Sequence, residues 1–146
     1  MPQIGLDCEM VLDNTGYFVK PGSYIMRQPR NRKITVRADG ANAYVDIGPG
    51  KRLWELTILC LNELKRYDGA NVSLTGQQYR DALRASFLAS SGTTINFSEP
   101  IGSSSIAVHF DAYQERILNL HSQVIAPATG GSPGASYEVS ITLVEA

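Results

Sequence analysis

The feature that most constrains this fold is an alternation of apolar and polar residues along several short segments. In GASYEVSITLVEA, residues 134–146, the residues Tyr137, Val139, Ile141 and Leu143 alternate with polar ones. Such alternation places the apolar side chains on one face, as in a β-strand with one buried face. The same pattern occurs at residues 3–12, 33–38, 43–47, 52–61, 94–98 and 106–110. The sequence therefore predicts about seven or eight strands, and turn signals such as Asp39-Gly40 favour antiparallel hairpins.

One segment has the periodicity of a helix. Tyr79, Leu83 and Phe87 repeat every fourth residue, which places them on a single apolar stripe. Thr75 followed by Gln78 matches a capping box, and Gly92 is a natural stop signal. We therefore expect one α-helix at about residues 75–90.

These elements predict a mainly β (α+β) fold, an antiparallel β-sandwich or barrel-like sheet flanked by one α-helix. The chain has 146 residues, which favours a single domain over residues 1–146. The segment PATGGSPG at residues 127–134 predicts a flexible loop.

A long connection at residues 16–32 is unusually apolar for a surface loop. Long structured loops tend to be functional or to pack against something, so this segment is a candidate partner-contacting arm. Basic residues gather at its end, and arginines there suit ion pairs with carboxylates of a neighbouring subunit. The predicted subunit interface comprises Tyr17, Phe18, Tyr24, Met26, Arg27, Arg30, Arg32 and Val144.

A search for catalytic motifs is mostly negative. The histidines His109 and His121 have no neighbouring cysteine, and no HExxH or CxxC pattern occurs. The segment GPGKR at residues 48–52 lacks the P-loop spacing and leads into a strand, so it is interpreted as a turn. Cys8 and Cys60 are interpreted as buried apolar residues, with a disulfide between them left open. We expect that the chain is not an enzyme and that it has no cofactor and no metal site.

Charge and composition narrow the classes of partner. The net charge of −1 gives no general argument for nucleic acid or for an anionic membrane. The N-terminus has no signal-peptide pattern, and no apolar run approaches the ~20 residues of a membrane span. Charged residues make up 18% of the chain, below the ~25% of an average soluble protein. The surface is therefore either polar and uncharged or buried in an assembly.

The last two thirds of the chain resemble a known class of protein. The order is RLWELTI, a helix with YRDALRASF, then TTINFSEPIG, IAVHFDAYQERI, a glycine-rich loop and a closing YEVSITLVE. This order, over about residues 50–146, resembles small structural proteins of tailed bacteriophages, of the distal-tail or tail-tube-like class. The resemblance implies a β-sandwich with one flanking helix that assembles into rings.

The function implied by this resemblance is structural. The chain would be a virion protein, assembled in the host cytoplasm, that forms a ring or tube in the tail or baseplate. Its partners would be itself, in a hexamer or alternatively a trimer, and other virion proteins. Two other interpretations stay open: a capsid decoration protein, and a small-ligand or carbohydrate-binding β-domain lined by Trp54 and tyrosines.

Overall fold

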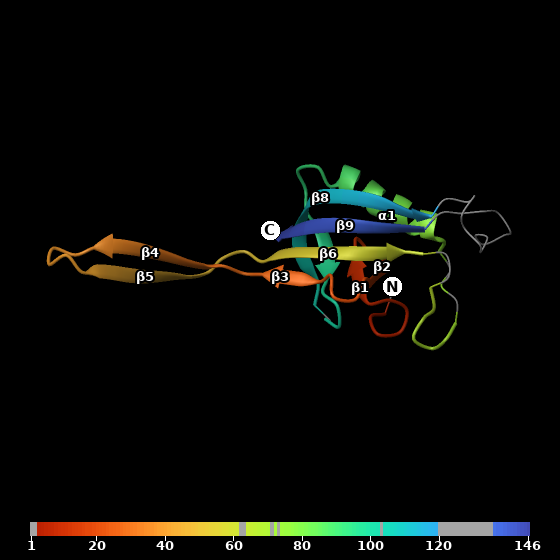
Figure 1. Ribbon diagram of the computed structural model, residues 1–146, viewed down its shortest axis with the longest axis horizontal. Helices are drawn as coiled ribbons and strands as arrows, with labels where there is room; N and C mark the ends of the chain where they lie inside the picture. The colour runs from red at the N-terminus through yellow and green to blue at the C-terminus, as the bar shows by residue number, and fades with distance from the viewer. Residues whose placement is uncertain (1–2, 62–63, 71, 73, 103, 120–135) are drawn as a thin grey trace.

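A computed structural model describes residues 3–61, 64–70, 72, 74–102, 104–119 and 136–146. Its elements give a mainly β body with one helix and a separate extended hairpin (Figure 1). The strands are β1 (Met10–Leu12), β2 (Thr15–Val19), β3 (Ile25–Arg27), β4 (Arg30–Val36), β5 (Asn42–Pro49), β6 (Leu53–Cys60), β7 (Ile95–Ser98), β8 (Ile106–Asn119) and β9 (Ser136–Glu145), and the helix is α1 (Gly76–Ala89). The predicted fold class is confirmed.

The body is an antiparallel sheet that curls into a barrel. Its seven strands follow the order β2-β1-β7-β8-β9-β6-β3, and a further pairing of β2 with β6 closes six of them into a ring. Both β2 and β3 lie along one edge of β6: Phe18 pairs with Leu59, and Met26 pairs with Trp54. The other edge of β6 pairs with β9. Closure leaves an interior that side chains fill.

The core follows the predicted alternation. Along β9 the side chains of Tyr137, Val139, Ile141 and Leu143 are buried, and β6 alternates in the same way. Trp54 is fully buried and packs edge-on against Phe97, with 5.2 Å between ring centroids. Trp54 is therefore a core residue, although the sequence left open that it lines a ligand site.

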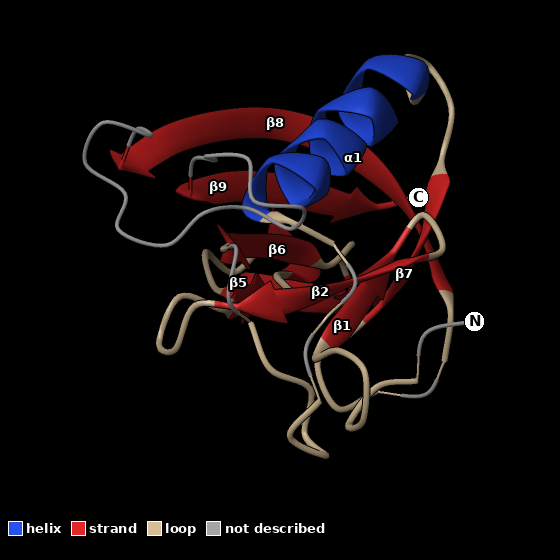
Figure 2. Cartoon of the chain, turned by 90° about the vertical axis from the view of Figure 1, so that its right-hand side faces the viewer, coloured by secondary structure: helices blue, strands red, loops and turns tan. Residues whose placement is uncertain are grey.

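The helix lies over β8 and β9 and closes one side of the body (Figure 2). Its predicted capping box is present, because the Thr75 side chain accepts from the Gln78 N–H and the Gln78 side chain accepts from the Thr75 N–H. Tyr79 and Leu83 are buried, and Phe87 packs edge-on against Phe110 with ring centroids 5.1 Å apart. The apolar stripe thus holds the helix on the barrel.

Two strand boundaries differ from the sequence prediction. The strand expected at residues 3–12 forms only at Met10–Leu12, because the preceding residues turn through Gly5, whose φ is +92°. The strand expected at residues 106–110 continues to Asn119, since β8 stays paired with β9 across two register shifts. A bulge lets a strand change its twist without ending, and alternation in the sequence is interrupted there.

The main difference from the sequence prediction is the position of the arm. Residues 16–32 do not form an extended arm, because β2 is a strand of the barrel wall and β3 pairs with β6. The extended arm is the β4–β5 hairpin, which reaches far from the body in Figure 1. The predicted loop at residues 127–134 and His121 lie outside the described residues.

Candidate functional site

The candidate site is the β4–β5 hairpin together with the residues that hold it, and we call residues 28–51 the arm. All seven residues of β4 are exposed, including Ile34 at 59% and Val36 at 69%. The two strands pair with each other from Arg30–Pro49 to Val36–Asn42, and neither pairs with a described strand of the barrel. An isolated two-stranded hairpin is marginally stable at best in water. The arm therefore presents apolar side chains and strand edges that none of the described residues covers.

The tip is a tight turn built by the sequence Ala38-Asp39-Gly40. Gly40 has a φ of +84°, a conformation that other residues adopt only with strain, and its N–H donates to the Arg37 carbonyl. The Arg37 N–H donates to the Ala41 carbonyl, and the Asp39 carboxylate accepts from the Ala41 N–H. This turn was predicted from the Asp-Gly signal, and it fixes the register of the hairpin.

Charge is distributed unevenly between the arm and the body. The arm carries five basic and two acidic residues, a formal charge of +3, so the remaining residues carry −4 to give the total of −1. The basic residues are Arg30, Arg32, Lys33, Arg37 and Lys51. The arm of one copy and the body of another copy therefore carry net charges of opposite sign, which favours contact between them.

The arm narrows where it meets the barrel. The Gly50 N–H donates to the Pro29 carbonyl, and the Gln28 side chain donates to the Gly50 carbonyl at 3.1 Å. A Cβ on Gly50 would lie 2.9 Å from the Pro29 oxygen, so this approach of the two backbones requires glycine. The segments that enter and leave the arm are thus hydrogen-bonded to each other at its base, and beyond this point they diverge into β3 and β6.

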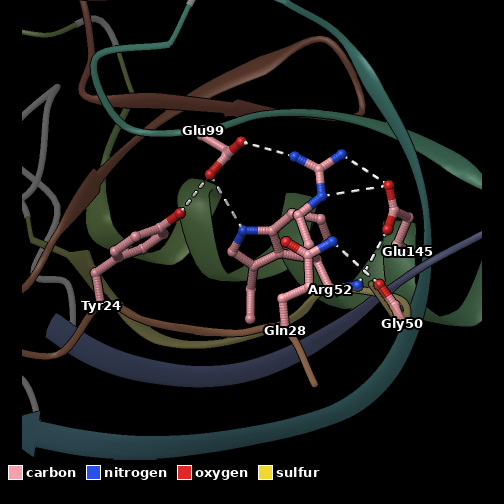
Figure 3. Close-up of polar contacts among 7 residues, drawn as sticks. Tyr24, Gln28, Gly50, Arg52, Glu99 and Glu145 are labelled. Atoms are coloured by element: carbon pink, nitrogen blue, oxygen red, sulfur yellow. Dashed lines mark hydrogen bonds and ion pairs between the residues drawn. The ribbon is translucent and has the colours of Figure 1, made fainter. Parts of the chain in front are cut away.

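A network of polar side chains lies in the barrel at the point where the arm leaves it (Figure 3). The Arg52 guanidinium donates to Glu145 Oε2 from Nη2 at 2.7 Å and from Nε at 3.2 Å. The Arg52 backbone N–H donates to Glu145 Oε1 at 3.0 Å, and the Glu145 N–H donates to the Arg52 carbonyl at 2.9 Å. The residue that follows the arm is therefore clamped to the last residue of β9 by side chain and backbone together.

Glu99 connects this clamp to two aromatic residues. It accepts from Arg52 Nη1 at 3.4 Å, from the Tyr24 hydroxyl at 2.9 Å and from the Trp54 indole at 3.4 Å. The Arg52 guanidinium also lies over the Trp54 ring, 5.2 Å from its centroid. Four segments far apart in the sequence thus meet at the arm root, which we define as Tyr24, Arg52, Trp54, Glu99 and Glu145.

The surroundings of the root keep the Glu145 carboxylate ionised and the Tyr24 hydroxyl protonated. Hydrogen bonds from Arg52 lower the pKa of Glu145 below its usual 4.5. At Tyr24, burial and the hydrogen bond to Glu99 raise the pKa well above the usual 10, which keeps the phenol protonated as a donor. Charge-assisted hydrogen bonds of this kind are stronger than neutral ones and hold a defined geometry.

The structure separates the residues predicted at the interface. Tyr17 and Phe18 are buried in the barrel, so their predicted interface role is wrong. Tyr24 lies in the root, Met26 and Arg27 lie exposed on β3, and Arg27 pairs with Glu55 of its own chain at 3.2 Å. Arg30 and Arg32 lie on the arm. Val144 is half-buried on β9, between Leu53 of β6 and His109 of β8.

Sequence reasoning missed the apolar face of the arm and the two acidic residues of the root. Ile34 and Val36 were assigned to a hairpin of the sheet, since alternation does not reveal whether another layer covers the apolar face. Glu99 and Glu145 are remote from Arg52 in sequence, and only the topology brings them together. The excess of basic residues between Arg27 and Arg37 was the one signal that pointed to the correct segment.

Groups that could support chemistry are few in the described part of the chain. Cys8 and Cys60 are buried free thiols, and burial raises their pKa to about 11 and about 12. No group of three or more His, Cys, Asp or Glu side chains is arranged as metal ligands among the described residues. None of the described helices has the length and hydropathy needed to cross a membrane.

Comparison with known proteins adds no relative. Neither protein-family models nor the curated proteins contain a match to this chain.

Proposed function

We propose that this chain is a structural subunit of a tailed bacteriophage virion that assembles with its own copies into a ring or tube of the tail or baseplate. The class of virion protein rests on the resemblance over residues 50–146. The mode of action rests on one observation, the exposed basic arm anchored rigidly to an acidic barrel.

The arm supports assembly because its composition does not suit a free surface loop. Ile34 and Val36 are more than half exposed, and burying them against a neighbour would gain roughly 25 cal/mol per Å² of apolar surface. The opposite charges of arm and body favour contact between copies and disfavour contact between two arms. The hydrogen bond from Gly50 to Pro29 joins the two segments at the base of the arm, and Arg52 just beyond it is bound to Glu145. These contacts limit the freedom of the base, so less conformational entropy is lost on docking.

Open strand edges offer a second contact. Strand β3 pairs only with β6, and β8 beyond Val108 pairs only with β9 among the described strands. These edges lie at opposite ends of the run β3-β6-β9-β8. An edge with unpaired backbone groups can add a strand from a neighbour, and joining unlike edges generates rings.

The proposal is tested by the mass of the protein in solution. Size-exclusion chromatography with light scattering is run on the full chain and on a variant in which residues 31–48 are replaced by a short glycine-serine linker. We expect the full chain to form a closed oligomer, with a hexamer favoured over a trimer, or longer tubes. The shortened variant should remain monomeric.

The shortened variant should keep its fold, because the arm pairs with none of the strands of the barrel that the structure describes. Circular dichroism and the melting temperature check this point. A full chain that stays monomeric at high concentration, or a folded shortened variant that assembles equally well, contradicts the proposal.

A further inference from the structure

A recess lies between the end of α1 and the start of β8. It has a volume of about 440 Å³ and is lined by Phe87, Leu88 and Ser90 from the helix side and by His109, Phe110 and Asp111 from β8. Leu88 is 65% exposed and is not among the buried residues that hold the helix on the barrel. One wall is therefore apolar and partly uncovered.

The recess also contains an acidic side chain. Asp111 is exposed and forms no ion pair among the described residues. The last turn of α1 contains no basic residue, so the partial negative charge of the helix C-terminus is not balanced there. A partner that brings both a cation and an apolar side chain would complement the two walls.

The outer half of the arm has this combination. Beyond the register shift at Asn31/Arg32, alternation along β4 places Ile34 and Val36 on one face and Lys33 on the other, and Arg37 follows directly after the strand. A hairpin end that enters the recess can present its apolar face to Leu88 and its basic face to Asp111. The arm of the same molecule extends away from its own body, which leaves a second copy as the source (Figure 1).

We propose that the α1–β8 recess is the acceptor for the arm of a neighbouring copy. This inference rests on the proposed self-assembly and specifies its contact: Ile34 and Val36 against Leu88, and Arg37 or Lys33 against Asp111. The contact is heterologous, since the donor and acceptor surfaces differ, and it therefore propagates from copy to copy until a ring closes or a tube grows.

Disulfide trapping tests this contact. The double variant Val36→Cys with Leu88→Cys is oxidised at a concentration where the wild type assembles, and the products are separated on a denaturing, non-reducing gel. The native cysteines Cys8 and Cys60 are at most 1% exposed, so they should not react. We expect a ladder of covalent oligomers that collapses to one band on reduction. Each single variant can give no product larger than a dimer.

A matched control combines Val36→Cys with Tyr67→Cys, because Tyr67 is 60% exposed but lies outside the recess. This pair should give no ladder. In addition, Asp111→Lys should raise the concentration needed for assembly severalfold, whereas Asp68→Lys, outside the recess, should leave it unchanged.

The outcomes separate this inference from the proposed function. If the wild type assembles and the arm-shortened variant does not, yet Val36 and Leu88 give no ladder, the arm docks elsewhere and this inference is overturned. A ladder with Tyr67 as strong as that with Leu88 overturns it equally, because the trapping would not be specific. If the wild type never assembles, this result contradicts both the proposed function and the proposed acceptor role of the recess.

Discussion

Arg52 is the residue through which the arm is attached to the barrel. Its guanidinium contacts Glu145 at the end of β9, Glu99 after β7 and the ring of Trp54 on β6. The side chains of Arg52 and Glu145 are each about a quarter exposed, so water screens their attraction only in part. Several donors converging on two carboxylates define one orientation of Arg52, the residue that follows the arm, which a single exposed ion pair does not achieve.

The charge of Glu145 predicts a dependence on pH. Because Arg52 lowers the pKa of Glu145 in the folded chain below 4.5, the contact stabilises the fold above pH 4.5. That contribution is lost as the pH falls through the lowered folded-state pKa. We therefore expect Glu145→Gln to lower the melting temperature at neutral pH, and the difference from the wild type to shrink in acid.

Melting curves from about pH 7 to about pH 2 measure this difference. Glu55→Gln serves as the control, since the Arg27–Glu55 pair is largely exposed and should contribute little. A difference between wild type and Glu145→Gln that stays constant down to the lowest pH would mean that the charge of Glu145 is unimportant.

The helix and the arm show that apolar residues with the same periodicity can be either buried or exposed. In α1, Leu83 is fully buried against the barrel, while Leu88 is 65% exposed beside the recess. In the arm, Ile34 and Val36 alternate as core residues do, yet nothing in the described chain covers them. Periodicity identifies an apolar face, but only the tertiary arrangement decides what packs on it.

The two leucines of α1 should respond differently to truncation. Leu83→Ala leaves a cavity between the helix and the barrel and should lower the free energy of unfolding by about 2–5 kcal/mol. Leu88→Ala removes a surface side chain and should change it by less than about 0.5 kcal/mol. Urea denaturation followed by circular dichroism measures both, and equal effects would contradict the placement of the helix.

Much of the element structure could be predicted from sequence. Alternation gave β6 and β9 closely, and the capping box gave the start of α1, because these signals arise from local geometry and a single buried face. The arm was placed wrongly at residues 16–32, since Tyr17 and Phe18 next to turn residues resemble an apolar loop. Their burial depends on pairing of β2 with β1 and β6, which no local pattern encodes.

At the scale of the whole molecule, the chain divides into a compact barrel and an arm of opposite charge. The barrel has its own core and pairs most of its strand edges, whereas no described residue of the barrel covers β4 of the arm. The root fixes Arg52, the residue that follows the arm, and the arm extends away from the body (Figure 1). We propose that the barrel is stable in the monomer and that the arm is covered only when copies of the chain assemble.

Hydrogen–deuterium exchange at increasing protein concentration tests that claim most directly. An uncovered hairpin opens readily, so its amides in β4 and β5 should exchange fast in dilute solution, while those of β6 and β9 stay protected. We predict that the β4–β5 amides become protected over the same concentration range in which light scattering reports assembly, with the barrel amides unchanged. Rapid exchange of the β4–β5 amides in the fully assembled protein would contradict the account.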